Sequence, residues 1–269
     1  MLRMLVERLR RGAHTLPFPG QAVEFPERFR GRPVFDVARC TDGCRTCAER
    51  APTPLITIAG DGAAALDLGA CLFSPDEAAA CPGGAIAYTT DHRMASGSRV
   101  GLVTPSGEVE TARALDRAMR RLFGRSLRLR SVVAGSCGGC EVELNALGNV
   151  VFDMARFGIQ FVASPRHADG IVVTGTVNPN MRTALEKTYE ALPDPRLVIA
   201  VGACAIAGGP FRASPEAGRG VPDSLPVDLY VPGCPPHPLT VLDGLLRLLG
   251  RIEDGSRAGH REGTAAPVG

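Results

Sequence analysis

The sequence predicts an α/β fold in which a parallel-sheet domain follows a smaller α+β domain. From about residue 127 onward, apolar strands alternate with helical segments, as expected for a parallel sheet covered on both faces. Residues 35–90 instead contain only short apolar runs between closely spaced cysteines. Residues 91–99 are polar and small, and predict a linker between the two parts. A chain of 269 residues is long enough for both domains.

The predicted elements follow in chain order. The first domain has strands at 55–58 and 86–89, and a helix at 108–123 follows the linker because its apolar residues form one stripe. The second domain has strands at 129–133, 159–163, 171–174, 197–201 and 228–231, and helices at 141–157, 181–192 and 239–249. The polar tail after Arg251 is predicted to be disordered. The expected divisions are therefore 1–95, 96–250 and 251–269.

A short amphipathic helix is predicted at the N-terminus. Its apolar residues Leu2, Leu5, Val6 and Leu9 have helical spacing, and arginines flank them. Such a helix either docks on a partner subunit, which is the favoured interpretation, or lies on anionic lipid.

Composition excludes two broad classes of function. A net charge of +2 gives no reason to expect nucleic acid as a partner. No apolar run reaches the length of a transmembrane helix, so any connection to a membrane would come through partners or a surface helix.

The nine cysteines form two sets of four with one left over. The first set is Cys40, Cys44, Cys47 and Cys81, the second is Cys137, Cys140, Cys204 and Cys234, and Cys71 remains. Four thiolates are the ligands of one iron-sulfur cluster. The count therefore predicts two cluster sites.

The first set follows a degenerate form of the ferredoxin run C-x2-C-x2-C-x3-C-P, which occurs twice in two-cluster ferredoxins with crossed fourth ligands. The second run here ends at Cys81-Pro82, but Ser74 and Glu77 stand at two of its earlier ligand positions. The first run has Ala51 at its fourth position and one extra residue in its first gap. Crossed ligation therefore leaves one complete cubane site and one lost site. Cys71 is then expected to be a buried apolar residue.

Disulfides and zinc are the competing interpretations of the first set. No secretory signal precedes these cysteines, so the thiols are expected to be reduced or metal-bound. Zinc stays open because C-x2-C is also a zinc-ligand spacing. The two Cys/Ala-Pro endings at the expected distances favour an iron-sulfur cluster.

The second set lies at the carboxyl ends of predicted strands. Cys137 and Cys140 follow the strand ending near Val133, Cys204 follows the strand ending at Val201, and Cys234 follows the next. Ligands of open parallel sheets bind at this edge. Glycines surround every cysteine and would let backbone amides approach the cluster sulfurs.

Three of these segments carry a resemblance to a known family. They are Ser136-Cys-Gly-Gly-Cys-Glu-Val-Glu143, Gly202-Ala-Cys-Ala-Ile-Ala-Gly-Gly209 and Val231-Pro-Gly-Cys-Pro-Pro236, supported by Ser164-Pro-Arg-His-Ala-Asp169 and Val173-Thr-Gly175. Over residues 100–250 they resemble the B-type subunit of respiratory complex I (NADH-quinone oxidoreductase) and the small subunits of complex I-related, group 4 NiFe hydrogenases, including formate hydrogenlyase. The first 95 residues are similar to the ferredoxin-like subunit of the same complexes, including Phe29-Arg-Gly-Arg-Pro33.

The resemblance implies a flavodoxin-like domain and an electron-transfer role without a catalytic centre in this chain. The complex I branch has adjacent cysteines at the first ligand position, whereas the hydrogenase branch has the C-x2-C spacing found at Cys137 and Cys140. The implied cofactors are two 4Fe-4S clusters. The implied partners are a NiFe hydrogenase or complex I-like large subunit, membrane-arm subunits and other ferredoxin-like electron carriers. The implied location is cytoplasmic and peripheral, on the inner face of the cell membrane.

Five further residues are candidates for tuning a cluster or contacting the partner: Glu141, Glu143, Arg166, His167 and His237. For Glu141 and Glu143, the alternative is capping of a helix N-terminus, where a carboxylate interacts favourably with the helix dipole. For His237 the alternative is a solvated loop histidine.

Two other functions stay open at this stage. One is a subunit of a complex I-like quinone oxidoreductase without hydrogenase activity. The other is a stand-alone iron-sulfur binding or sensor protein, which would be a monomer without an exposed apolar face around Cys137 and Cys140.

Overall fold

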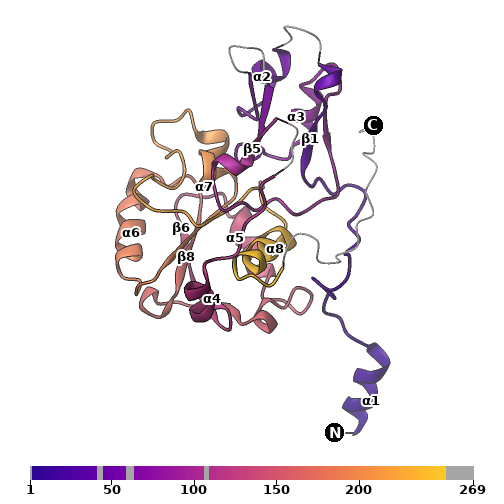
Figure 1. Ribbon diagram of the computed structural model, residues 1–269, viewed down its shortest axis with the longest axis vertical. Coiled ribbons are helices and arrows are strands. Elements are labelled where there is room, and N and C mark those ends of the chain that lie inside the picture. Colours follow the sequence, from indigo (N-terminus) through magenta and orange to yellow (C-terminus); the bar gives the residue numbers. More distant parts are fainter. Residues whose placement is uncertain (1, 41–44, 59–63, 106–108, 253–269) are drawn as a thin grey trace.

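The structure is a computed structural model that describes residues 2–40, 45–58, 64–105 and 109–252 (Figure 1). The predicted tail lies almost entirely outside these ranges, as does the predicted ligand Cys44. The chain forms a sheet-and-helix body with a smaller region of short strands at one end.

A five-stranded parallel sheet forms the centre of the larger region. Its strands are β6 (Leu127–Val133), β7 (Ile159–Phe161), β8 (Gly170–Thr174), β9 (Leu197–Val201) and β10 (Leu229–Val231). Their order is β10-β9-β8-β6-β7, and every neighbouring pair is parallel. Counted along the chain this is the order 2-1-3-4-5 of flavodoxin-like folds. The predicted fold class is thereby confirmed.

Helices cover this sheet (Figure 1). They are α5 (Gly139–Ala146), α6 (Pro179–Glu190), α7 (Ala203–Ala207) and α8 (Pro238–Leu248). Every residue of α8 is buried, because its leucines pack on the sheet residues Leu229 and Val231 while Phe18 of the N-terminal segment joins the same core. Shorter 3-10 turns are η1 (Val37–Arg39), η2 (Val100–Leu102), η3 (Met154–Phe157), η4 (Pro165–His167) and η5 (Gly209–Phe211).

The smaller region is built from two antiparallel sheets. β1 (Pro33–Phe35) pairs with β4 (Ile86–Tyr88), and β2 (Ile56–Ile58) pairs with β3 (Ala64–Asp67), which pairs with β5 (Val103–Thr104). The helices α2 (Thr46–Arg50) and α3 (Pro75–Ala79) lie beside them. The sequence placed the end of this domain at residue 95. Because β5 lies after that residue and pairs with β3, the smaller region also includes residues beyond the predicted boundary.

Two predicted helices are shorter than the sequence indicated. The helix predicted at 108–123 is observed as α4 (Arg117–Phe123), because the Asp116 carboxylate caps the amides of Ala118 and Met119. The preceding apolar residues bond to other elements instead: the Ala112 amide donates to the Ala95 carbonyl. The helix predicted at 141–157 ends at Ala146, and a turn capped by Asn149 separates it from η3.

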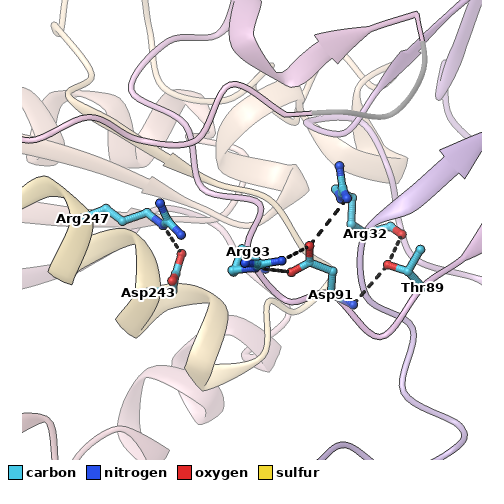
Figure 2. Close-up of polar contacts among 6 residues, drawn as sticks. All are labelled: Arg32, Thr89, Asp91, Arg93, Asp243 and Arg247. Carbon is cyan, nitrogen blue, oxygen red and sulfur yellow. Dashed lines mark hydrogen bonds and ion pairs between the residues drawn. The ribbon is translucent and has the colours of Figure 1, made fainter. Parts of the chain in front are cut away.

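The segment predicted as a linker is a packed connection. Met94, Ala95 and Ser96 are buried, and Ser96 forms an isolated bridge with Tyr230 of β10. The Asp91 carboxylate accepts two hydrogen bonds from the Arg93 guanidinium, at 2.8 and 2.9 Å. Figure 2 shows this pair. The linker prediction was wrong because the polar residues of this segment form hydrogen bonds within the protein, and its apolar residues are buried.

Arg32 and Thr89 extend this polar junction toward the smaller region (Figure 2). The Arg32 guanidinium lies 3.6 Å from the Asp91 carboxylate, and the Thr89 hydroxyl donates to the Arg32 carbonyl. On the other side, α8 contributes a buried ion pair between Asp243 and Arg247 at 2.8 Å. Burial would raise the pKa of Asp91, but its bonds to Arg93 and the charges of Arg93 and Arg32 lower it overall.

The two regions also share an apolar core. Leu68 and Leu102 of the smaller region belong to one buried cluster with Ala205 and Ile206 of α7. Arg99 adds a bidentate ion pair to Asp67, with distances of 2.9 and 2.6 Å. The smaller region therefore rests on the helix that carries Cys204.

The predicted N-terminal helix is α1 (Leu2–Arg11), and it extends away from the body in Figure 1. Met4 and Leu9 are 76% and 80% exposed, so the apolar side of α1 has little cover from this chain. No helix in the described part of the chain is long and apolar enough to cross a membrane.

Candidate metal centres

The four cysteines of the second set lie at the carboxyl-terminal edge of the parallel sheet. Cys137 and Cys140 follow β6 where α5 begins, Cys204 lies in the first turn of α7 after β9, and Cys234 follows β10. Cys137 and Cys234 are exposed, whereas Cys140 and Cys204 are half-buried. The chain thus presents a group of thiols at one end of a rigid sheet, in the crevice where parallel sheets bind ligands.

Burial and the charges of neighbouring groups shift the pKa values of these thiols. Burial, followed by the charges of Glu141 and the other three thiols, raises the pKa of Cys140 to about 12. Burial likewise raises the pKa of Cys204 to about 11, with contributions from Cys234, Cys137 and Glu141. Four thiolates this close repel one another, so a cation bound among them would favour their deprotonation.

Two glycines make room for the sulfur atoms. A Cβ atom on Gly202 would lie 2.6 Å from the Cys140 Sγ, and one on Gly209 would lie 2.7 Å from the Cys204 Sγ. Both residues also have positive φ angles, +90° and +54°, which favour glycine. Any larger residue at either position would displace a candidate ligand.

Glu141 braces the loop that carries Cys137. Its carboxylate accepts hydrogen bonds from the Ser136 hydroxyl at 2.8 Å and from the Thr174 hydroxyl at the end of β8. The Ser136 hydroxyl in turn accepts from the Gly138 amide. Glu141 therefore ties the cysteine loop to the sheet, in addition to lying in the first turn of α5.

Glu143 and His237 lie beside Cys234. They line the same cavity of about 300 Å³, together with Phe73 and Thr240. Burial raises the pKa of Glu143 and lowers the pKa of His237.

His237 is half-buried rather than solvated. Its Nδ1 accepts a hydrogen bond from the Leu239 amide at the start of α8, and its ring lies 5.3 to 5.8 Å from the rings of Phe25, Phe29 and Phe152. Arg166 and His167 are on η4, between β7 and β8, and not on a loop that carries a cysteine.

The described cysteines of the first set share one core. Cys47 is buried at α2, and Cys40 and Cys81 are half-buried against the same apolar cluster. The Ala85 amide donates a hydrogen bond to the Cys81 Sγ at 3.3 Å, a contact of the kind that tunes cluster sulfurs and ligands. Cys44, the fourth predicted ligand, lies outside the described residues.

Cys71 is fully buried, as the sequence predicted for the leftover cysteine. Its thiol donates to the carboxylate of Glu77, a residue that sequence reasoning noted only as a lost ligand. Glu77 is itself completely buried and accepts hydrogen bonds from two backbone amides and from Tyr88. The pairing of Ser74 with Glu77 three residues later is a capping-box pattern and could have revealed part of this arrangement.

The donor set at the sheet edge fits a cubane cluster. Among the described residues, no three His, Cys, Asp or Glu side chains are grouped so that they could hold one metal ion. A cubane differs from a single ion because each of its four irons takes one thiolate, so its ligands stand further apart. Four convergent thiols with space kept by Gly202 and Gly209 suit that larger group.

Comparison with known proteins identifies relatives of the larger region. A family model described as the 20 kDa subunit of NADH ubiquinone oxidoreductase matches residues 137–248. The B-type subunit of NADH-quinone oxidoreductase from Heliobacterium modesticaldum is 46% identical over 125 residues, which are 46% of this chain and 71% of that protein. A probable membrane-bound hydrogenase subunit of Pyrococcus furiosus is 41% identical over 132 residues, 49% of this chain and 79% of the relative.

Two further similarities are more partial. Formate hydrogenlyase subunit 7 of Escherichia coli is 37% identical over 153 residues, 57% of this chain and 60% of that protein. Among solved structures, a chain of an archaeal membrane-bound sulfane sulfur reductase aligns with 52% of this chain and 78% of its own, at 36% identity and a TM-score of 0.44.

Proposed function

Because this chain belongs to the family of the 20 kDa subunit of NADH ubiquinone oxidoreductase, we propose that it is the electron-transfer subunit of a membrane-associated NiFe hydrogenase complex. Its relatives are named as subunits of NADH-quinone oxidoreductase, membrane-bound hydrogenase and formate hydrogenlyase. The observation that carries the proposal is the placement of four cysteines on segments that follow β6, β9 and β10, at the carboxyl-terminal edge of the sheet. The C-x2-C spacing of Cys137 and Cys140 favours the hydrogenase branch.

Two 4Fe-4S clusters are the proposed cofactors. Cys137, Cys140, Cys204 and Cys234 would hold one, and Cys40, Cys44, Cys47 and Cys81 would hold the other. A bound cluster supplies one-electron redox chemistry at a potential that the surrounding protein sets. We assign no bond-making step to this chain.

The residues around the thiols would control the reduction potential of the cluster and the route by which electrons pass between the two sites. Glu141 holds the Cys137 loop on the sheet, and Gly202 keeps the space beside Cys140 free. Cys47 belongs to the same buried core as Ala205, the neighbour of Cys204. A continuous apolar core between the two cysteine sets excludes water from the region that electrons would cross, which supports a relay between them.

The proposed partner covers the exposed side of the second site. Val142 on α5 and Phe211 on η5 are 66% and 52% exposed, and each lies in a segment next to a candidate ligand. Exposed apolar residues around exposed thiols are typical of a surface that another protein covers. This observation favours a complex over a stand-alone sensor protein. The large subunit would carry the nickel-iron site.

The complex is proposed to be cytoplasmic and peripheral at the inner face of the cell membrane, with membrane-arm subunits and other ferredoxin-like carriers as further partners. The exposed apolar side of α1 suits docking onto one of these subunits. The names of the relatives support membrane association, because they include a membrane-bound hydrogenase.

Anaerobic purification of the native complex tests the proposal. We expect the chain to elute with a large subunit, with nickel present and with hydrogen-dependent reduction of an artificial acceptor. Elution as a monomer would contradict it. A complex without nickel that reduces quinone would instead support the alternative, a complex I-like oxidoreductase, whose large subunit would lack the two C-x2-C pairs that hold nickel and iron.

A further inference from the structure

A buried carboxylate stands at the lost cluster position of the smaller region. The ferredoxin-type spacing that ends at Cys81-Pro82 places ligand positions at Cys71, Ser74 and Glu77. In the structure these three residues still gather at one point, around the N-terminus of α3. What they surround is the Glu77 side chain, which is completely buried.

The loop that would cradle a cluster donates its hydrogen bonds to Glu77. The Leu72 amide donates to Oε1 at 2.9 Å and the Ser74 amide to Oε2 at 3.1 Å. The Tyr88 hydroxyl lies 2.9 Å from Oε2 and the Cys71 thiol 3.4 Å from it. Backbone amides of such loops ordinarily face cluster sulfurs. Here they face a carboxylate, so an anion still occupies the centre.

The Glu77 carboxylate is the shared acceptor at the centre of this group. The Thr53 hydroxyl lies 3.3 Å from Oε1 and donates at 2.7 Å to the Ala70 carbonyl. The amides of Leu72 and Ser74 can act only as donors, which suits an ionised carboxylate. Burial and then the charge of Glu77 raise the pKa of the Cys71 thiol, so this sulfur keeps its proton. Burial, with the charges of Cys71 and Glu77, also raises the pKa of Tyr88. The thiol and the phenol are therefore neutral groups packed against the buried Glu77 carboxylate.

This charge lies near the second cysteine site. Phe73 belongs to the loop that Glu77 holds, and it lines the cavity of about 300 Å³ that Cys234 also lines. Arg28 and Arg30 line the same cavity with the opposite charge, and the Arg30 guanidinium bonds to the Phe73 carbonyl at 2.5 Å.

We propose that Glu77 replaces a second cubane as the anionic centre of the smaller region and lowers the reduction potential of the cluster bound through Cys234. Reduction adds negative charge to a cluster, and a nearby buried anion opposes this. Glu77 acts here as a positioning and tuning residue and not as a ligand. The inference rests on the proposed function, because it requires a cluster at Cys234.

The test uses the full chain, loaded anaerobically, in a redox titration followed by electron paramagnetic resonance. Glu77→Gln removes the charge and keeps the shape, so the midpoint potential of the Cys234 cluster should rise. Asp76→Asn is the matched control, because Asp76 is an exposed carboxylate on the same helix, and its midpoint should stay at the wild-type value. An unchanged midpoint in Glu77→Gln, with both cluster signals present, would overturn the inference.

Glu77→Asp separates charge from packing. It keeps the negative charge on a shorter side chain, so its midpoint should remain close to that of the wild type even if the smaller region becomes less stable. Equal shifts in the Asp and Gln variants would show that packing sets the potential, and would overturn the proposal. If the wild-type chain itself binds no cluster at Cys234, the proposed function fails instead, and the two failures are distinguishable.

The position of Glu77 has its own test. Ala51→Cys, Ser74→Cys and Glu77→Cys together with Cys71 restore the four ligands of the second ferredoxin site. This variant should bind about four more irons than the wild type. A variant that keeps the Cys234 cluster but gains no iron would show that Glu77 does not occupy a cubane position.

Discussion

The two cysteine sets of this chain rest on scaffolds of different kinds. The second set is carried by three loops at one edge of a parallel sheet whose central strands, β8 and β9, are completely buried. The described members of the first set lie among strands of two to four residues and helices of five. A long buried sheet can hold a thiol group in place by itself, whereas a small region needs a further centre to complete its core.

The smaller region contains two different centres that can complete its core. One of its two ferredoxin-type positions keeps the cysteines expected of a cluster site, and the other contains the buried Glu77 with its donors. The second position is filled and not empty, because the buried Glu77 carboxylate accepts the hydrogen bonds of the Leu72 and Ser74 amides. A buried polar group is stabilised only when its hydrogen bonds are made, and here they are.

Cys234→Ala should have the largest effect, because it removes a ligand from the rigid site. We expect loss of about four irons and of electron transfer, while the signal of the first site remains. Iron analysis and electron paramagnetic resonance of the anaerobically purified variant measure both. A variant that kept its electron-transfer activity would contradict the relay between the two sites.

Arg247→Met tests how much the rigid scaffold depends on its buried ion pair. Asp243 and Arg247 are 3% and 4% exposed, so removing the guanidinium leaves an uncompensated buried carboxylate. The variant should lose about 3 to 5 kcal/mol of unfolding free energy, measured by urea denaturation. Adding Asp243→Leu should recover much of this loss. A single variant with wild-type stability would mean that the pair does not support α8.

The pH dependence of the unfolding free energy should report the titration of His92, which lies at the junction of the two regions. Burial lowers its pKa to about 4, and its Nε2 has no hydrogen-bond partner among the described residues. The folded pKa lies below the unfolded one, near 6.5, so the unfolded chain binds the proton more tightly and stability falls as pH decreases between these values.

Between pH 7 and pH 5 this histidine should cost about 2 kcal/mol of unfolding free energy. His92→Phe should remove that part of the loss, because the new ring fits beside Phe18 and Phe25 and does not titrate. His14→Gln, at an exposed position, is the control. Equal losses in His92→Phe and the wild type would show that His92 is not the group responsible.

Cys71→Ala should have the smallest effect. The thiol is one of several donors to Glu77, so its removal should lower the unfolding free energy by about 1 kcal/mol and leave the iron content unchanged. Thermal unfolding and iron analysis measure the two quantities. Loss of about four irons would mean that Cys71 is a ligand and that the first cluster site was assigned to the wrong cysteines.

The sheet was predictable from the sequence because buried parallel strands form continuous apolar runs. β9 was predicted with its observed bounds, and the other four strands within two residues at either end. The apolar stripe at 109–115 misled the helix prediction, since the same residues form an irregular segment before the Asp116 cap. The polar composition of residues 91–99 led to the linker prediction, but polar side chains in this segment hydrogen-bond to one another and the segment is packed.

The positions of the candidate cysteines were predictable because these residues lie in recognisable sequence motifs. The spacing placed Cys137, Cys140, Cys204 and Cys234 after the carboxyl ends of three strands, and the structure has them at these positions. The roles of Glu141 and Glu77 were not predictable in full, because each depends on partners far along the chain. Thr174 lies 33 residues after Glu141, and Tyr88 lies 11 residues after Glu77.

Iron and acid-labile sulfide analysis of the anaerobically purified full chain, with spectra of the reduced clusters, tests the central claim most directly. The account predicts about eight irons and two distinct cubane signals, one for each scaffold. About four irons with a single signal would contradict it. That result would mean that the smaller region binds no cluster and that no relay runs between the two sites.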